Sequence, residues 1–221
     1  MIDEFRVLIP DSVLSASGAV FYSGRAAFST PSPLYILGLN PGGSPLLQAD
    51  DTVRKHTDMV LNEKPNHWSE YQDETWLDGH ERGASGMQPR VVHLLKRLGF
   101  DPQNTPASNV VFVRSALERD IVSRFSKIAE DCWPFHQAVI ERLGVRVVLC
   151  FGQRAGNWVC SQLNATNLVD NFVEKNKRHW QSRAYRTANG ITVVVATHPS
   201  RADWANPLTD PTGLVRRMMQ P

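Results

Sequence analysis

The sequence predicts an α/β domain in which helices cover both faces of a central parallel sheet, in three layers. Short apolar runs of strand length alternate with longer segments that have helical periodicity, and several of these runs end abruptly in Gly, Asn, Pro or His. This alternation favours right-handed crossovers between parallel strands. The 221 residues, 42% of them hydrophobic, suit one domain over 1–221, with residues 1–33 packed on it as an N-terminal extension.

Four apolar runs are the candidate strands of this sheet. They lie at 34–38, 109–113, 145–151 and 191–197, and they are rich in Val, Ile and Leu. Continuous apolar runs of this kind are typical of strands that are buried on both faces. The segment VFY at 20–22 could add a short edge strand.

Helices are expected between and after these runs. The clearest pattern is at 87–98, where apolar residues recur at helical spacing, Pro89 suits the first turn and Gly99 the C-terminal stop. Similar patterns predict helices at 49–61, 126–143, 154–162 and 212–219. Residues 62–86 are polar and irregular, and a loop of this length in a compact domain is more often functional or mobile than idle.

Charge is locally concentrated near the last apolar run. The net charge is only +2, but residues 175–186, KNKRHWQSRAYR, contain five Lys or Arg and no acid. Trp180 and Tyr185 lie among them. Basic residues beside aromatic ones suit contact with phosphates and stacking on bases. A solvated loop or hairpin before the last strand would have the same composition.

The composition also limits the class of protein. No apolar run approaches the roughly 20 residues that a membrane span needs, and the N-terminus lacks a signal-peptide pattern, so we expect a soluble, cytoplasmic protein. Cys132, Cys150 and Cys160 are too few and too scattered for a disulfide framework, and none forms a CxxC pair. We expect no metal site and no cofactor.

Two strand ends carry the candidate chemistry. The run at 34–38 ends in Asn40-Pro41-Gly42-Gly43, and the run at 191–197 ends in His198-Pro199-Ser200. In open α/β sheets, ligands bind beyond the carboxyl ends of the strands, so parallel strands would place Asn40 and His198 at one cleft. Each motif also has a structural interpretation, because Asn-Pro-Gly is ordinary turn chemistry and a loop histidine can cap backbone groups.

Together, GLNPG at 38–42 and HPS at 198–200 resemble the two signature motifs of the uracil-DNA glycosylase superfamily. The first motif is most similar to the mismatch-specific and single-strand-selective branches, and the resemblance spans roughly residues 34–220. It implies a three-layer α/β/α sandwich with a four-stranded parallel sheet in the order 2-1-3-4. It also implies hydrolysis of the N-glycosidic bond of uracil or a related damaged base in DNA. Some branches hold an iron–sulfur cluster on four cysteines, and that ligand set is missing here.

The resemblance implies the two catalytic roles. Asn40 would position the attacking water by its amide oxygen, and His198 would donate a hydrogen bond to the leaving base. A neutral imidazole whose tautomer is fixed by a neighbour would suit His198 best.

Other residues would contact the base. The first loop would contribute Gly38, Leu39 and Pro41. In much of the superfamily an asparagine at the end of the second strand reads the base, and here that place falls at Arg114 or Ser115. Asn109 is excluded, because the expected strand begins there, about 16 Å from its end at ~3.3 Å per residue. The stacking phenylalanine of the family is absent, and Trp68, Tyr71 or Trp76 could replace it.

DNA is the expected partner, bound by a monomer. The residues expected to contact it are Gly42, Gly43, Ser44, Ser200, Arg201, Trp204, Lys177 and Arg178. Arg201 could touch phosphate or fill a vacated stack, whereas Trp204 could instead anchor its loop in the core. Two alternatives stay open. One is a nucleic-acid-binding protein without the chemistry, and the other, weaker one is a nucleotide or phosphoester hydrolase.

Overall fold

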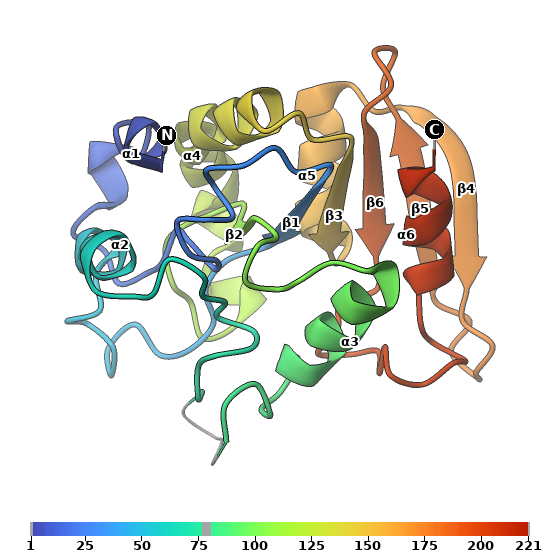
Figure 1. Ribbon diagram of the computed structural model, residues 1–221, viewed down its shortest axis with the longest axis horizontal. Coiled ribbons are helices and arrows are strands. Elements are labelled where there is room, and N and C mark those ends of the chain that lie inside the picture. The colour runs from blue at the N-terminus through green and yellow to red at the C-terminus, as the bar shows by residue number, and fades with distance from the viewer. Residues whose placement is uncertain (1, 77–80, 221) are drawn as a thin grey trace.

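A computed structural model describes residues 2–76 and 81–220, and it contains one six-stranded mixed sheet between helices (Figure 1). The strand order is β2-β1-β3-β6-β5-β4. The strands are β1 (Leu34–Gly38), β2 (Ala107–Asn109), β3 (Val147–Phe151), β4 (Asn167–Val173), β5 (Gln181–Arg186) and β6 (Thr192–Ala196). The helices are α1 (Ile2–Arg6), α2 (Val53–Asn62), α3 (Gln88–Leu98), α4 (Val122–Arg142), α5 (Gln153–Leu163) and α6 (Thr212–Met219), with 3-10 turns η1 (Asp11–Val13) and η2 (Glu118–Asp120).

The expected α/β architecture is confirmed, but the expected sheet of four parallel strands is corrected to six mixed strands. The strands β2, β1, β3 and β6 are parallel and adjacent in that order. The strands β4 and β5 add an antiparallel hairpin beyond β6. The segment 175–186 is therefore the turn and second strand of a hairpin. It lacks a clear strand signal because the buried positions of β5 are the small residues Ser182 and Ala184.

The second strand is displaced from its expected place. The chain pairs with β1 only over Ala107–Asn109, where Asn109 is in register with Gly38. The apolar residues that follow run beside the loop after β1, since the N–H groups of Val110 and Val111 donate to the carbonyls of Gly38 and Leu39. The apolar run at 109–113 thus marks a buried segment rather than a strand. Residues 20–22 also form no strand.

Two apolar cores lie on opposite faces of the sheet. Tyr35 and Leu37 of β1 belong to the core with α4 and α5, whereas Leu34 and Ile36 belong to the core with α3 and α6. Figure 1 shows these pairs of helices on opposite sides of the sheet. Residues 1–33 contribute Phe5, Phe21 and Phe28 to the α4/α5 core. Within the described ranges, no helix is long and apolar enough to cross a membrane.

Most expected helices are confirmed within a few residues. The helix at 212–219 has the expected bounds. Gly99 ends α3 with φ of 85°, in the left-handed region that favours glycine. These helices return the chain to the sheet so that the carboxyl ends of β1, β3 and β6 lie at one edge.

Candidate functional site

The candidate site lies at the carboxyl edge of the parallel strands. Asn40 follows β1, Gly152 follows β3 and His198 follows β6. Because β3 pairs with both β1 and β6, the Asn40 and His198 loops flank the end of β3. The ring of Phe151, the last residue of β3, lies 6.2 Å from that of His198.

The side-chain amide of Asn40 is held in one orientation. Its Nδ2 donates to the Pro41 carbonyl at 2.9 Å, to Ser115 Oγ at 2.9 Å and to the Val113 carbonyl at 3.4 Å. Carbonyl oxygens can only accept, so the NH₂ group must lie on this side. Asn40 Oδ1 accepts no hydrogen bond from any residue that the structure describes. The loop therefore presents an oriented, free acceptor.

Arg114 and Ser115 brace this loop. The Ser115 N–H donates to the Pro41 carbonyl at 3.1 Å, and Arg114 Nη1 donates to the Gly42 carbonyl at 2.5 Å. Arg114 Nε also binds Ser17 Oγ at 3.1 Å. Both side chains, expected at the base, thus bind the loop that carries Asn40.

The premise on which Asn109 is excluded, that a strand begins there, is wrong. Asn109 is the last residue of β2 rather than the first residue of a strand, and it is only 4% exposed. A Cβ added to Gly38 would lie 2.1 Å from Asn109 Oδ1, so glycine is needed for the amide to lie there. Asn109 Nδ2 is buried and makes no hydrogen bond of normal geometry to a described residue, although the Tyr22 hydroxyl lies beside the amide. Such a group is costly unless a ligand completes it. The GLNPG motif, which begins at Gly38, gives no sign of this contact.

Tyr22 lies beside Asn109, and two further aromatic rings and an acid are connected to it. Tyr71 packs against Tyr22 and Trp76, with ring centroids 5.7 and 6.4 Å away. Trp76 Nε1 donates to Glu70 Oε1 at 2.8 Å. Burial raises the pKa of Glu70 from 4.5 to about 7, although the bond from Trp76 lowers it. Sequence reasoning missed Tyr22 and Glu70, which carry no motif.

Of the three aromatic residues expected at the base, Trp68 and Tyr71 are each 2% exposed and Trp76 is partly buried. Trp68 belongs to the α4/α5 core and donates to Glu74 Oε1 at 2.6 Å. Tyr71 is in the α3/α6 core, and its ring centroid lies 6.2 Å from that of Phe151. Tyr71 thus packs beside the end of β3 at Phe151, whereas Trp68 packs on the other side of the sheet.

His198 is a neutral imidazole with a defined tautomer. The backbone N–H of Ser200 donates to His198 Nδ1 at 3.1 Å, and Ser200 Oγ lies 2.7 Å from the same atom. A backbone N–H cannot accept, so Nδ1 is unprotonated and Nε2 carries the hydrogen. Burial lowers the pKa of His198 from 6.5 to about 4; Glu118 raises it and Arg201 lowers it. His198 Nε2–H is a hydrogen-bond donor at neutral pH.

Gly152 lies against the His198 ring, and its backbone conformation favours glycine. Its φ of 86° and ψ of 164° lie where only glycine is comfortable. A Cβ there would lie 3.5 Å from His198 Cδ2. The Gly152 N–H also donates to the Ala196 carbonyl at 2.9 Å, which joins the ends of β3 and β6.

The loop after His198 is anchored at three points. Arg90 Nη1 donates to the Pro199 carbonyl at 2.5 Å, and Arg178 Nη1 donates to the Arg201 carbonyl at 2.7 Å. Trp204 is fully buried, and its Nε1 donates to the Thr197 carbonyl at 3.1 Å. Trp204 is therefore an anchor and presents no surface to a ligand, whereas Arg201 is exposed.

The other residues expected at DNA lie around this edge. Gly42 and Gly43 are exposed. Ser44 Oγ accepts a hydrogen bond from the Leu47 N–H at 3.3 Å. Ser200 Oγ lies at hydrogen-bond distance from His198 Nδ1. Lys177 and Arg178 lie in the exposed β4–β5 turn.

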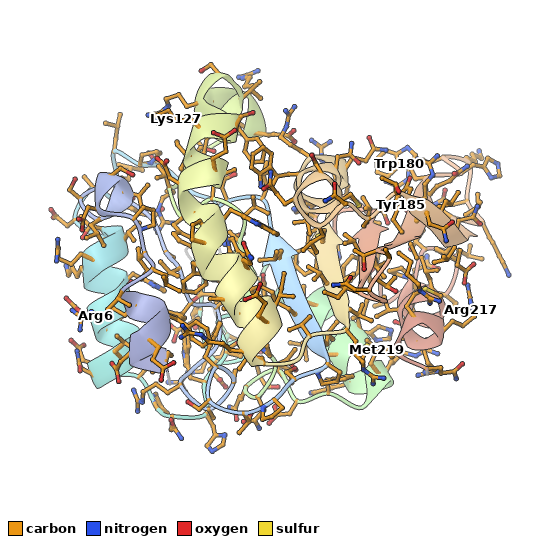
Figure 2. All side chains as sticks on the ribbon, turned by 90° about the horizontal axis from the view of Figure 1, so that it is seen from above. Arg6, Lys127, Trp180, Tyr185, Arg217 and Met219 are labelled. Atoms are coloured by element: carbon orange, nitrogen blue, oxygen red, sulfur yellow. The ribbon has the colours of Figure 1, made fainter. Side chains whose placement is uncertain are left out.

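The Arg178 guanidinium is the best-anchored charge of that turn. It lies 4.1 Å from the Trp180 ring centroid and 3.2 Å from Glu174 Oε2. Trp180 directly precedes β5 at this turn, whereas Tyr185 lies near the other end of β5; Figure 2 labels both on the hairpin side of the molecule.

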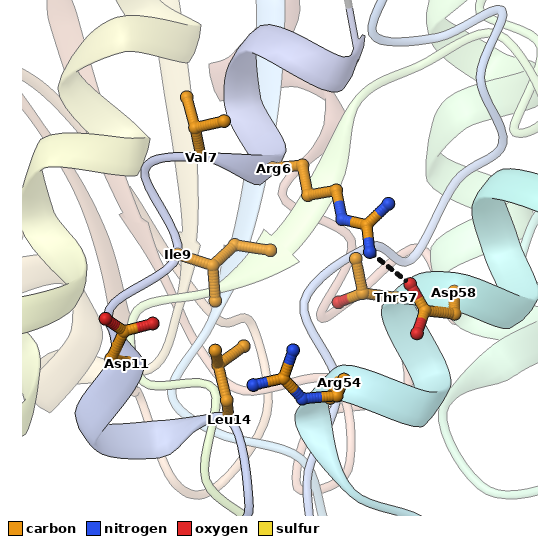
Figure 3. A pocket seen from close by; sticks show the side chains of 8 residues that line it. All are labelled: Arg6, Val7, Ile9, Asp11, Leu14, Arg54, Thr57 and Asp58. Carbon is orange, nitrogen blue, oxygen red and sulfur yellow. Dashed lines mark hydrogen bonds and ion pairs between the residues drawn. The ribbon is translucent and has the colours of Figure 1, made fainter.

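A cavity of about 180 Å³ lies away from this edge, between α1, η1 and α2 (Figure 3). It is lined by Arg6, Val7, Ile9, Asp11, Leu14, Arg54, Thr57 and Asp58. An ion pair between Arg6 and Asp58, 2.7 Å long, occupies one wall. None of the residues expected at the site lines this cavity. Over residues 2–76 and 81–220, no group of three or more His, Cys, Asp or Glu could hold a metal ion.

In comparisons with known proteins, no protein-family model and no curated protein matches the chain.

Proposed function

We propose that the protein is a monofunctional DNA glycosylase that hydrolyses the N-glycosidic bond of uracil or a related damaged base. The observation that carries this proposal is that one sheet edge holds both an oriented, free amide oxygen, on Asn40, and a neutral imidazole N–H, on His198. The resemblance of residues 38–42 and 198–200 to the uracil-DNA glycosylase superfamily supports it, as does the parallel order β2-β1-β3-β6.

Cleavage of this bond builds positive charge on the sugar and negative charge on the leaving base. Asn40 Oδ1 would accept a hydrogen bond from water and so aim an oxygen lone pair at the sugar carbon. His198 Nε2–H would donate to a carbonyl oxygen of the base as negative charge develops there. The C–N bond breaks and its electron pair leaves with the base, the water oxygen forms the new C–O bond, and the proton that the water loses passes to the departed base or to solvent. Neither motif contains a lysine, so strand cleavage through a Schiff base is not expected.

Asn109 completes the proposed site. Its buried Nδ2 lies beside the Tyr22 hydroxyl but makes no hydrogen bond of normal geometry, and a second carbonyl oxygen of the base would satisfy it. Gly38 supports this role, because a larger residue would displace the amide.

Base release from labelled oligonucleotides tests the proposal. The panel contains uracil, hypoxanthine, xanthine or mismatched thymine, in single and double strands, with EDTA present. We expect release from at least one substrate. Absence of release from all of them, beside measurable DNA binding, would contradict the proposal and favour a nucleic-acid-binding protein without this chemistry.

The β4–β5 turn is the proposed contact with the DNA backbone. Lys175 and Lys177 are exposed and form no ion pair among the described residues, while the nearby Glu174 is buried and bound to Arg178. We expect the double change Lys175→Glu and Lys177→Glu to weaken DNA binding and to make the salt dependence shallower by about one unit of log–log slope per lysine.

Fluorescence anisotropy at several salt concentrations measures this effect. Arg146→Glu is the control, because this exposed residue directly precedes β3 at the opposite edge of the sheet and reverses a charge in the same way. Equal weakening by the control would show a general charge effect and remove the hairpin from the interface.

A further inference from the structure

Leu46 and Leu47 are the most exposed large apolar side chains that the structure describes, at 89% and 87%. A single exposed leucine is ordinary on a protein surface. Two adjacent ones with almost no protein contact are less so, and these follow Asn40 by only a few residues. Their position next to the proposed catalytic loop suggests a role in that site.

The backbone that carries the two leucines is fastened on both sides. The Gln48 N–H donates to the Ser44 carbonyl at 3.0 Å, and Ser17 Oγ donates to the Gln48 carbonyl at 2.7 Å. Before the pair, Gly43 turns the chain with φ of 104°, and Arg114 holds the Gly42 carbonyl. The loop is thus a hydrogen-bonded turn that presents both side chains to solvent.

This turn is continuous with the site. It leaves the carboxyl end of β1, and the same Arg114-Ser115 segment braces its start and orients Asn40. Figure 1 shows the segment after β1 on the side of the sheet at which β3 and β6 end. Trp204, the other large apolar candidate for contact with DNA, is fully buried. Leu46 and Leu47 are the most exposed apolar groups beside this edge, ahead of Leu117, which is 49% exposed and follows Ser115 by two residues.

We propose that Leu46 and Leu47 form a wedge that inserts into the base stack of duplex DNA beside the target nucleotide. This inference rests on the proposed function. A base must leave the stack before it can reach a pocket at a sheet edge. Apolar side chains inserted between base steps unstack them, and burial of the side chains offsets part of that cost. The flanking charges Asp50, Asp51, Arg54 and Lys55 cancel, which suits contact with bases more than with phosphates.

The test compares wild type with the double variant Leu46→Ala and Leu47→Ala. The substrate carries 2-aminopurine beside the target base, so its fluorescence rises when the stack opens. We expect a rise with wild type on duplex and none with the double variant at saturating protein. The ratio of duplex to single-strand base release should fall about 100-fold. Leu168→Ala is the matched control, because Leu168 is 50% exposed and lies near the start of β4, whose partner residues pair with the start of β6.

Two outcomes would overturn the wedge. One is an equal fluorescence rise with the double variant. The other is an unchanged ratio of duplex to single-strand release. If wild type releases no base at all, the proposed glycosylase fails, but the fluorescence comparison still decides whether the leucines open the stack. A surface used only for a protein partner would leave both measurements at the wild-type value and would also overturn the proposal.

Discussion

Asn40→Ala is expected to lower base release by at least about 100-fold with no loss of folding, because the attacking water loses the acceptor that aims it. The substitution removes Oδ1 but leaves the backbone bonds of the loop, including that from Ser115 to Pro41. Single-turnover base release measures the effect, and urea unfolding checks that the free energy of unfolding is retained. Wild-type rates in the variant would contradict the assigned role of Asn40.

Two further variants separate positioning from general damage. Asn66→Ala changes an exposed loop asparagine whose side chain makes no hydrogen bond to a described residue, so we expect wild-type release. Ser115→Ala removes one of the three acceptors of Asn40 Nδ2 and should cost about tenfold. Since Ser115 acts by orienting Asn40, its loss should add little to the effect of Asn40→Ala. Fully additive effects would mean that Ser115 acts separately.

The sequence predicts the parts of the fold that depend on local pattern. The helix at 212–219 and the stop at Gly99 follow from periodicity and from glycine's left-handed conformation. The β4–β5 hairpin was not predicted as part of the sheet. Its buried positions hold Ser182 and Ala184, and β4 has a register shift between Leu168 and Asp170 that breaks the alternation.

The candidate site likewise has residues that the sequence predicts and residues that it does not. The Asn40 and His198 loops are visible in the sequence because each follows a clear strand at a parallel edge. The apolar run at 109–113 predicts a strand that begins at Asn109, which would keep this side chain away from the site. The structure shows instead that β2 ends at Asn109. Glu70 and Tyr22 reach the site only through packing between distant segments. No local pattern records such contacts.

His198→Ala is expected to lower base release by about 100- to 1,000-fold, since it removes the donor that faces the leaving base. His198→Gln places an amide N–H near the same position and should recover part of the rate. Both variants should bind DNA like wild type in the salt series. A rate in His198→Ala within a few-fold of wild type would contradict the assigned role.

The pH dependence gives an independent test of the neutral ring. Because burial lowers the pKa of His198 to about 4, release should not change from about pH 8 to about pH 5 on account of this group. Below pH 4 the ring keeps its Nε2–H but gains a proton at Nδ1, so any fall in release would come from loss of the Ser200 bond that holds the ring. Protonation would also cost the bond from the Ser200 N–H, so the stability contributed by the neutral ring is present above pH 6.5 and is lost as the pH falls from 6.5 towards 4.

Glu70, whose pKa is raised to about 7, titrates within the measured range, and its neutral form contributes stability that is lost as the pH rises from 4.5 through 7. An inflection of the rate near pH 7 that persists in His198→Gln and disappears in Glu70→Gln would belong to Glu70. An inflection near pH 7 that vanishes in His198→Gln would mean that His198 titrates with an ordinary pKa, and the neutral-donor mechanism would then be wrong.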